Sequence, residues 1–230
     1  LRVLEEQRTQ GILITPVRDD ANALQRLRER GIAIVLLDRP SEREDLSSVA
    51  VDDVCGGEMA ITHLLEQGHE YMAFVRGPLS IRQCADRLQG VERGLRAAGL
   101  DPARVLLDIA TPTLTAKEGE ACVERLLAAE RTPTAVFCAN DLLALGVMRG
   151  LRKRNLAVPA DIALVGYDDV EFAAMLAPAL TSIRQPKYQL GRAAAELLLR
   201  EINNSPPYSY EQIVFQPELV VRESSVPVRR

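Results

Sequence analysis

The sequence predicts an α/β protein built on parallel β-sheets. Short apolar segments alternate along almost the whole chain with segments in which apolar residues recur at helical spacing, as strands that alternate with helices do. The loops between these segments are short, which indicates right-handed crossovers between parallel strands. Residues 134–139 are mostly apolar, as expected of a strand that is buried on both faces of its sheet.

The expected strands are short and mostly apolar. In chain order they are residues 12–15, 32–37, 49–51, 71–75, 105–109, 134–139, 162–166, 180–184, 212–215 and 218–222. The expected helices carry apolar residues on one face, and glycine or basic residues mark the ends of several of them. They are the segment containing Leu24 and Leu27, residues 55–67, 85–98, 115–129, 142–154 and 187–202, while residues 1–10 resemble the last turns of an earlier helix.

Polar residues follow two of the predicted strands directly. Asn140 comes after residues 134–139 in the position of a helix N-cap, and Asp141 lies in the first helical turn, where a negative charge is favourable. Asp168 comes after residues 162–166. Because small molecules bind outside the carboxyl ends of parallel strands, Asn140 and Asp168 are expected to be neighbours in one pocket.

Composition and charge exclude several classes of protein. The 230 residues are 47% hydrophobic, enough for one large domain or two small ones. The formal net charge is −4, with lysine and arginine scattered along the chain, so this chain does not have the basic surface of a nucleic-acid-binding domain. No apolar run approaches the roughly 20 residues that span a bilayer, so we expect no membrane association. The four cysteines form no CxxC pair, which argues against a metal site and a disulfide framework and favours a cytoplasmic protein.

Motifs of catalysis are absent from the sequence. It contains no glycine-rich phosphate loop, no GxSxG motif and no histidine paired with a carboxylate and a nucleophile. His63 and His69 are six residues apart, and we expect both to be structural. We therefore expect no catalytic residues, no metal, no cofactor and no enzymatic activity.

Six motifs occur in an order that is specific to one protein family. They are GHEYMAFVRGP, ADRLQGVERGLRAAGL, FCANDLLALGVMRGL, VPADIALVGYDD, LTSIRQP with LGRAAAELLL, and FQPELVVRES. Together they resemble the effector-binding domain of the lactose-repressor/galactose-repressor (LacI/GalR) family of bacterial transcription regulators, and the resemblance covers nearly all 230 residues.

This resemblance implies the fold of periplasmic binding proteins. Two parallel-sheet lobes would be joined by three crossovers, with the ligand cleft between them. The first lobe would comprise residues 1–51 plus 186–215, and the second residues 52–185 plus 216–230. The first strand of the first lobe, the hinge helix and the DNA-binding headpiece would be missing, so we interpret the chain as a fragment of a longer protein.

The resemblance also implies which residues of the second lobe bind the effector. Asp168 matches the family's ligand-binding acid, which can accept hydrogen bonds from neighbouring hydroxyl groups; the alternative is a solvated turn aspartate. Arg87 matches an arginine that donates to ligand hydroxyls or carboxylates; the alternative is an exposed helical arginine in a weak surface pair. Asn140 matches a ligand-contacting amide, although it could serve only as a helix cap.

Four further residues are candidate effector contacts. Asp38 and Arg39 end a first-lobe strand and so should face the same cleft, but Arg39 could instead brace its loop. Gln185 lies at a predicted crossover and matches a family contact position, although it could bond only to backbone. Leu114 stands where many family members have an aromatic ring, a departure that weakens the case for a flat ligand stacked there; the alternative is a leucine of the core beside a helix.

The function implied by the resemblance is that of an effector-sensing and dimerisation domain of a bacterial transcriptional repressor. A small metabolite, a sugar or sugar derivative, would control DNA binding allosterically. The expected partners are this effector, a second copy of the chain, and operator DNA contacted through the missing headpiece rather than through this chain. The alternative is an extracytoplasmic solute-binding protein of the same fold, which would act as a monomer.

Overall fold

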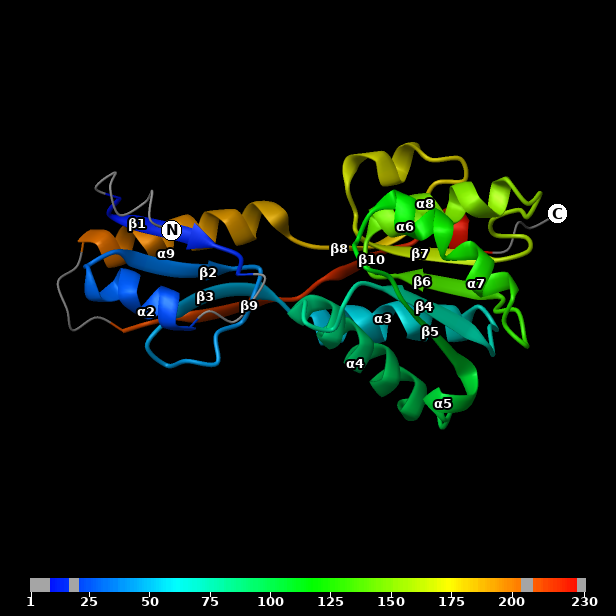
Figure 1. Ribbon diagram of the computed structural model, residues 1–230, viewed down its shortest axis with the longest axis horizontal. Coiled ribbons are helices and arrows are strands. Elements are labelled where there is room, and N and C mark those ends of the chain that lie inside the picture. Colours follow the sequence, from blue (N-terminus) through cyan, green and yellow to red (C-terminus); the bar gives the residue numbers. More distant parts are fainter. Residues whose placement is uncertain (1–8, 17–20, 204–208, 227–230) are drawn as a thin grey trace. The chain divides into compact units, whose positions relative to one another are not determined.

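The computed structural model describes residues 9–16, 21–203 and 209–226. The chain divides into two compact units, and it passes between them three times (Figure 1). Unit 1 is Leu1–Asp52 with Pro186–Gln216, and unit 2 is Asp53–Gln185 with Pro217–Arg230.

Unit 1 contains a four-stranded, entirely parallel sheet in the order β1-β2-β3-β9. Its strands are β1 (Gly11–Ile14), β2 (Ala33–Leu37), β3 (Ser47–Val51) and β9 (Gln212–Phe215), and its helices are α2 (Ala21–Glu29) and α9 (Lys187–Asn203). Side chains alternate between the two faces of a strand. Ile34 and Leu36 therefore pack with α2, whereas Val35 between them packs with α9. This two-sided burial explains why β2 is apolar at every position.

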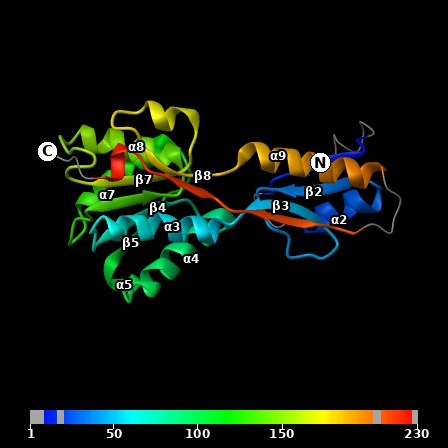
Figure 2. The same cartoon turned by 180° about the vertical axis from the view of Figure 1, so that it is seen from behind.

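Unit 2 contains a six-stranded sheet in the order β10-β8-β7-β6-β4-β5. Its strands are β4 (Met72–Arg76), β5 (Leu106–Ala110), β6 (Ala135–Cys138), β7 (Ala163–Asp168), β8 (Thr181–Arg184) and β10 (Glu218–Val220). The pair of β10 and β8 at one edge is antiparallel, and all other pairs are parallel (Figure 2).

Helices cover both faces of the unit 2 sheet. Its helices are α3 (Asp53–Glu66), α4 (Arg82–Ala97), α5 (Pro102–Val105), α6 (Ala116–Ala121), α7 (Val123–Leu127) and α8 (Asp141–Arg152), with short 3-10 helices η1 (Glu171–Met175) and η2 (Glu223–Ser225). Figure 1 shows α3 and α4 on one face, and α6 and α8 on the other. Central strands such as β6 are consequently buried at every position. Phe74 of β4 and Phe137 of β6 stack with their ring centroids 4.9 Å apart.

Two sequence expectations need correction or fall outside the described residues. The single helix expected at 115–129 is wrong, because the chain turns at Cys122 and forms two short helices, α6 and α7. The helical turns expected at residues 1–10 lie mostly outside the described residues. Within the described part of the chain, no helix is long and apolar enough to cross a membrane.

Candidate functional site

The candidate site of unit 2 lies where β6, β7 and β8 end. These strands are adjacent and parallel, so the residues that follow them emerge at the same edge of the sheet. Asp168 is the last residue of β7, while Asn140 lies two residues after β6 and Gln185 directly after β8. Ligands of parallel α/β sheets bind at this edge.

Arg87 of α4 contacts this edge of the sheet through Ala139 and is only 4% exposed. Its Nε donates to Oδ1 of Asp53 over 2.8 Å, and its Nη1 donates to the carbonyl oxygen of Ala139 at the end of β6. Its guanidinium carbon lies 3.5 Å from the centroid of the Tyr167 ring, a cation–π contact. The alternative of an exposed arginine in a surface pair is therefore wrong.

The surroundings of Arg87 keep its side chain charged. Burial by itself would lower the pKa of Arg87, but the nearby Asp53, Tyr167 and Asp168 outweigh this effect and raise the pKa. Burial also raises the pKa of the Tyr167 phenol well above its usual value, so the ring stays neutral beneath the guanidinium. The site thus contains a permanent positive charge with Asp53 as its direct counter-ion.

Close packing of α3 against α4 brings Asp53 and Arg87 together. A Cβ at Gly57 would lie 2.2 Å from the carbonyl oxygen of Arg87, and a Cβ at Gly90 would lie 2.0 Å from the carbonyl oxygen of Val54. Only glycine permits the two helix backbones to approach this closely. The first turn of α3, which contains Asp53, therefore lies directly against the middle of α4.

Asp168 is the last residue of β7 and has a left-handed backbone conformation, with φ of 103°. Its Oδ1 accepts a hydrogen bond of 2.6 Å from Nε2 of Gln185, the residue that follows β8. Its charge is also one of those that raise the pKa of Arg87. The structure thus brings together Arg87, Asp168 and Gln185, three residues that the resemblance implied.

Asn140 uses both ends of its amide within the protein. Its Oδ1 accepts from the backbone nitrogen of Leu143 over 2.9 Å and so caps α8, as the sequence predicted. Its Nδ2 donates to the carbonyl oxygen of Leu114 over 3.2 Å. Leu114 itself is partly buried and packs against the unit 2 core. Asn140 and Asp168 end neighbouring strands, but the two hydrogen bonds of Asn140 go to Leu143 and Leu114.

Comparison with known proteins identifies the family of this chain. The model of the periplasmic binding protein-like domain family matches residues 61–225. The HTH-type transcriptional repressor PurR of Haemophilus influenzae is 34% identical over 232 aligned residues, which cover 97% of this chain and 67% of that protein. The chain belongs to the LacI/GalR family.

Solved structures of LacI/GalR regulators have the same fold. A LacI family transcriptional regulator from Enterococcus faecium, solved with bound ribose, superposes with a TM-score of 0.91 at 28% identity, covering 99% of this chain and 83% of that one. The complex of the transcriptional regulator CelR with cellobiose has a TM-score of 0.86 at 34% identity, covering 97% of this chain and 68% of that one. This chain thus has the periplasmic-binding-protein-like fold of LacI/GalR transcriptional regulators.

Two acidic residues beside Asp168 have roles that our sequence reasoning missed. Asp141 is 1% exposed and accepts hydrogen bonds from Oγ of Ser182 over 2.7 Å and from the backbone nitrogen of Val170 over 2.8 Å. Burial raises the pKa of Asp141 to about 6. Asp141 therefore supports the turn that carries Asp168, and its signal in the sequence was its position in the ANDLLA motif, which we interpreted only as favourable for the helix dipole.

Asp169 differs from Asp168 in its partners. Its carboxylate forms ion pairs with Nε of Arg184 and Nη1 of Arg222, both at 2.7 Å. Burial alone would raise the pKa of Asp169, but the hydrogen bonds from Arg222 and Arg184 lower it below its usual range. Asp169 thus links β7 to β8 and to the segment after β10.

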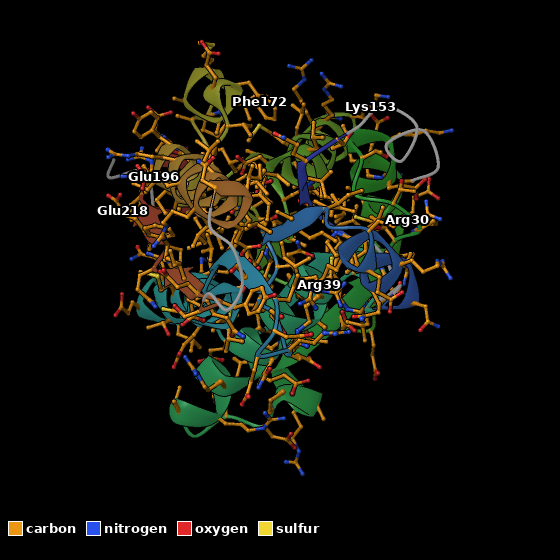
Figure 3. All side chains as sticks on the ribbon, turned by 90° about the vertical axis from the view of Figure 1, so that its left-hand side faces the viewer. Arg30, Arg39, Lys153, Phe172, Glu196 and Glu218 are labelled. Carbon is orange, nitrogen blue, oxygen red and sulfur yellow. The ribbon has the colours of Figure 1, made fainter. Side chains whose placement is uncertain are left out.

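Unit 1 contains the two remaining predicted effector contacts, Asp38 and Arg39, which are half-buried at the carboxyl end of β2. Asp38 has a left-handed backbone with φ of 56°, and its amide donates to the carbonyl oxygen of Val49 over 2.8 Å. Arg39 follows it (Figure 3), and its Nη1 donates to the carbonyl oxygen of Pro16 over 3.1 Å. This hydrogen bond fits the alternative role of Arg39, in which the side chain braces its loop.

The two histidines have local partners. Nε2 of His63 lies 2.7 Å from Oγ of Ser225, and Nδ1 of His69 lies 2.9 Å from Oγ1 of Thr134. Burial lowers the pKa of both rings. Across the described ranges, no group of three or more histidine, cysteine or acidic side chains is arranged to hold a metal ion.

Proposed function

We propose that this chain is the effector-sensing and dimerisation domain of a bacterial transcriptional repressor, and that a small metabolite controls its operator affinity. The observation that carries this proposal is the grouping of Arg87, Asp168 and Gln185 at the carboxyl end of the unit 2 sheet, in a chain 34% identical to a transcriptional repressor. A ligand that binds two conformations with different affinity shifts their populations, and this difference is the energy source of the control.

The effector class that we propose is a sugar or sugar derivative. A carboxylate such as that of Asp168 accepts hydrogen bonds from vicinal hydroxyl groups, and the guanidinium of Arg87 and the amides of Gln185 and Asn140 add donors. Two similar regulators were solved with ribose and with cellobiose. Leu114 offers an apolar surface but no aromatic ring. Asp38 and Arg39 of unit 1 are proposed as further contacts.

The proposal excludes catalysis and direct DNA binding by this chain. The relatives named above are regulators rather than enzymes. With a net charge of −4, this chain cannot supply the cationic contacts on which duplex affinity largely rests. A headpiece elsewhere in the full protein, working as a homodimer in the cytoplasm, would contact the operator. The repressor relatives favour this proposal over an extracytoplasmic solute-binding protein.

Calorimetric titration with ribose and cellobiose tests the effector site. Asp168→Asn removes the charge of one hydrogen-bond acceptor, which typically costs about 1.5–3 kcal/mol, so we expect the Kd to rise about 10- to 150-fold. Asp101→Asn is the matched control, because Asp101 is exposed and caps α5 away from the site, and asparagine retains the cap. If Asp168→Asn binds as tightly as the control, the site is misplaced.

A further inference from the structure

Two consecutive residues at the carboxyl end of β7 have a backbone conformation that glycine adopts far more readily than other residues. Asp168 and Asp169 have φ of 103° and 46°, in the left-handed region that residues with a Cβ rarely occupy. Such conformations cost free energy and persist only where the surrounding structure fixes them. The turn that presents the Asp168 carboxylate therefore needs partners that hold its backbone.

Two side chains from other elements hold the backbone amides that follow Asp168. The amide nitrogen of Asp169 donates to Oγ of Ser182 over 3.0 Å, and that of Val170 donates to Oδ2 of Asp141 over 2.8 Å. Oγ of Ser182 in turn donates to Oδ1 of Asp141 over 2.7 Å. Asp141 and Ser182 therefore hold the turn as one connected unit.

The packing of α8 against β7 and β8 brings the Asp141 carboxylate to this turn. Asn140 caps α8 through the backbone nitrogen of Leu143, so the carboxylate of Asp141 is not needed as the cap. Gly166 on β7 lies opposite Ser182 on β8, and a Cβ at Gly166 would lie 2.2 Å from Oδ1 of Asp141. Glycine at this position leaves the space in which the carboxylate reaches Ser182.

We propose that Asp141 and Ser182 are positioning residues for effector binding: through the amides of Asp169 and Val170, they hold the turn that places the Asp168 carboxylate in the site. This inference rests on the proposed function, because it takes Asp168 as an effector contact. It assigns to Asp141 and Ser182 a role that the sequence analysis did not consider.

The first experiment compares two buried serines by calorimetric titration with ribose and cellobiose. Ser182 and Ser224 are both 0% exposed, and each Oγ accepts from one backbone amide and donates to one oxygen atom. Ser182 contacts the turn, whereas Ser224 bonds to Thr181 and Leu164, so Ser224→Ala is the matched control.

The two serine variants should differ in sugar binding but not in stability. Each leaves a buried amide without its acceptor, so urea unfolding should show a similar loss of stability for both. We expect Ser182→Ala to raise the Kd of a sugar that the parent binds by about tenfold or more, and Ser224→Ala to change it by less than about twofold. The same Kd for both variants would refute the positioning role of Ser182.

A double-mutant cycle decides whether Asp141 acts through Asp168. Asp141→Asn replaces one carboxylate oxygen with an NH2 group, which cannot accept a hydrogen bond from Ser182 or Val170. Asp168→Gly removes the carboxylate that is to be positioned, and glycine suits the left-handed backbone. We expect Asp141→Asn to raise the Kd about tenfold in the parent but less than about threefold in Asp168→Gly. Equal factors in the two backgrounds would mean that Asp141 acts independently of Asp168, against the proposal.

The third experiment needs no ligand. Nε2 of Gln185 donates to Oδ1 of Asp168 over 2.6 Å, so the NMR signals of this side-chain amide report the position of the carboxylate. We expect these signals to shift in Asp141→Asn and in Ser182→Ala, and to stay in place in Ser224→Ala. Unchanged Gln185 signals in the folded variants would overturn the proposal.

These measurements separate a failure of the positioning role from a failure of the proposed function. If Asp141→Asn does not fold, the comparison of Ser182→Ala with its control decides the outcome. If the parent binds neither ribose nor cellobiose, the proposed sugar class fails, and the Gln185 signals decide for or against the positioning role.

Discussion

Replacing Gly90 with alanine tests the helix contact on which the candidate site depends. The added Cβ would lie 2.0 Å from the carbonyl oxygen of Val54 and 2.8 Å from the backbone nitrogen of Glu58. Carbon and oxygen atoms in contact are separated by about 3.3 Å, so α3 and α4 must move apart by roughly 1 Å. Both obstacles are backbone atoms of α3, which cannot rotate away as a side chain can.

Two opposing contributions determine how Gly90→Ala changes the free energy of unfolding. Overpacking typically costs about 1–3 kcal/mol, and a clash with backbone belongs at the upper end of this range. Alanine is favoured over glycine within a helix by about 1 kcal/mol. The free energy of unfolding should therefore fall by about 2 kcal/mol, which lowers the Tm of a domain of this size by about 4–8 °C.

Gly191→Ala is the matched control for this prediction. Gly191 also lies inside a helix, α9, but a Cβ there would meet no atom within 4 Å. This variant should be more stable than the parent by up to about 1 kcal/mol. Urea unfolding followed by circular dichroism measures both variants, provided that m is unchanged. A Gly90→Ala variant as stable as the parent would refute the close contact between α3 and α4.

Three further predictions follow from the described residues. The pKa of Asp141 is raised to about 6 from an ordinary 3.8, so between these pH values the folded state binds more protons than the unfolded state. The parent should therefore gain stability relative to Asp141→Asn as the pH falls from about 6 to 4. A stability difference between the two proteins that does not depend on pH would contradict the raised pKa. Burial raises the pKa of Cys84, Cys122 and Cys138. A thiol reagent at pH 8 should therefore label the half-buried Cys55 first, and all four cysteines only in denaturant. Equal labelling rates of the four cysteines in the native chain would be inconsistent with this packing. In a gel-shift titration at moderate salt, this chain alone should not retard operator DNA, whereas the full-length regulator should do so in an effector-dependent way. Retardation by this chain alone would show that its own surface binds DNA.

The sequence by itself determined most of the secondary structure and the family. Buried strands such as β6 are apolar throughout because both faces are covered, and this pattern is visible without any knowledge of the partners. Asn140 caps α8 through an atom of its own side chain and a backbone group three residues away, so a local signal was sufficient. The order of six motifs indicated the LacI/GalR family, which the comparisons show.

Tertiary structure decided the roles of the charged residues, because those roles depend on partners that are remote in sequence. Arg87 and Asp53 are 34 residues apart, and no spacing rule predicts that they form a buried pair rather than two surface charges. Asp168 and Asp169 are adjacent and chemically identical, yet one accepts from Gln185 while the other pairs with Arg184 and Arg222. Electrostatic energy depends on distance and on burial, and both are fixed only when the strands and helices pack.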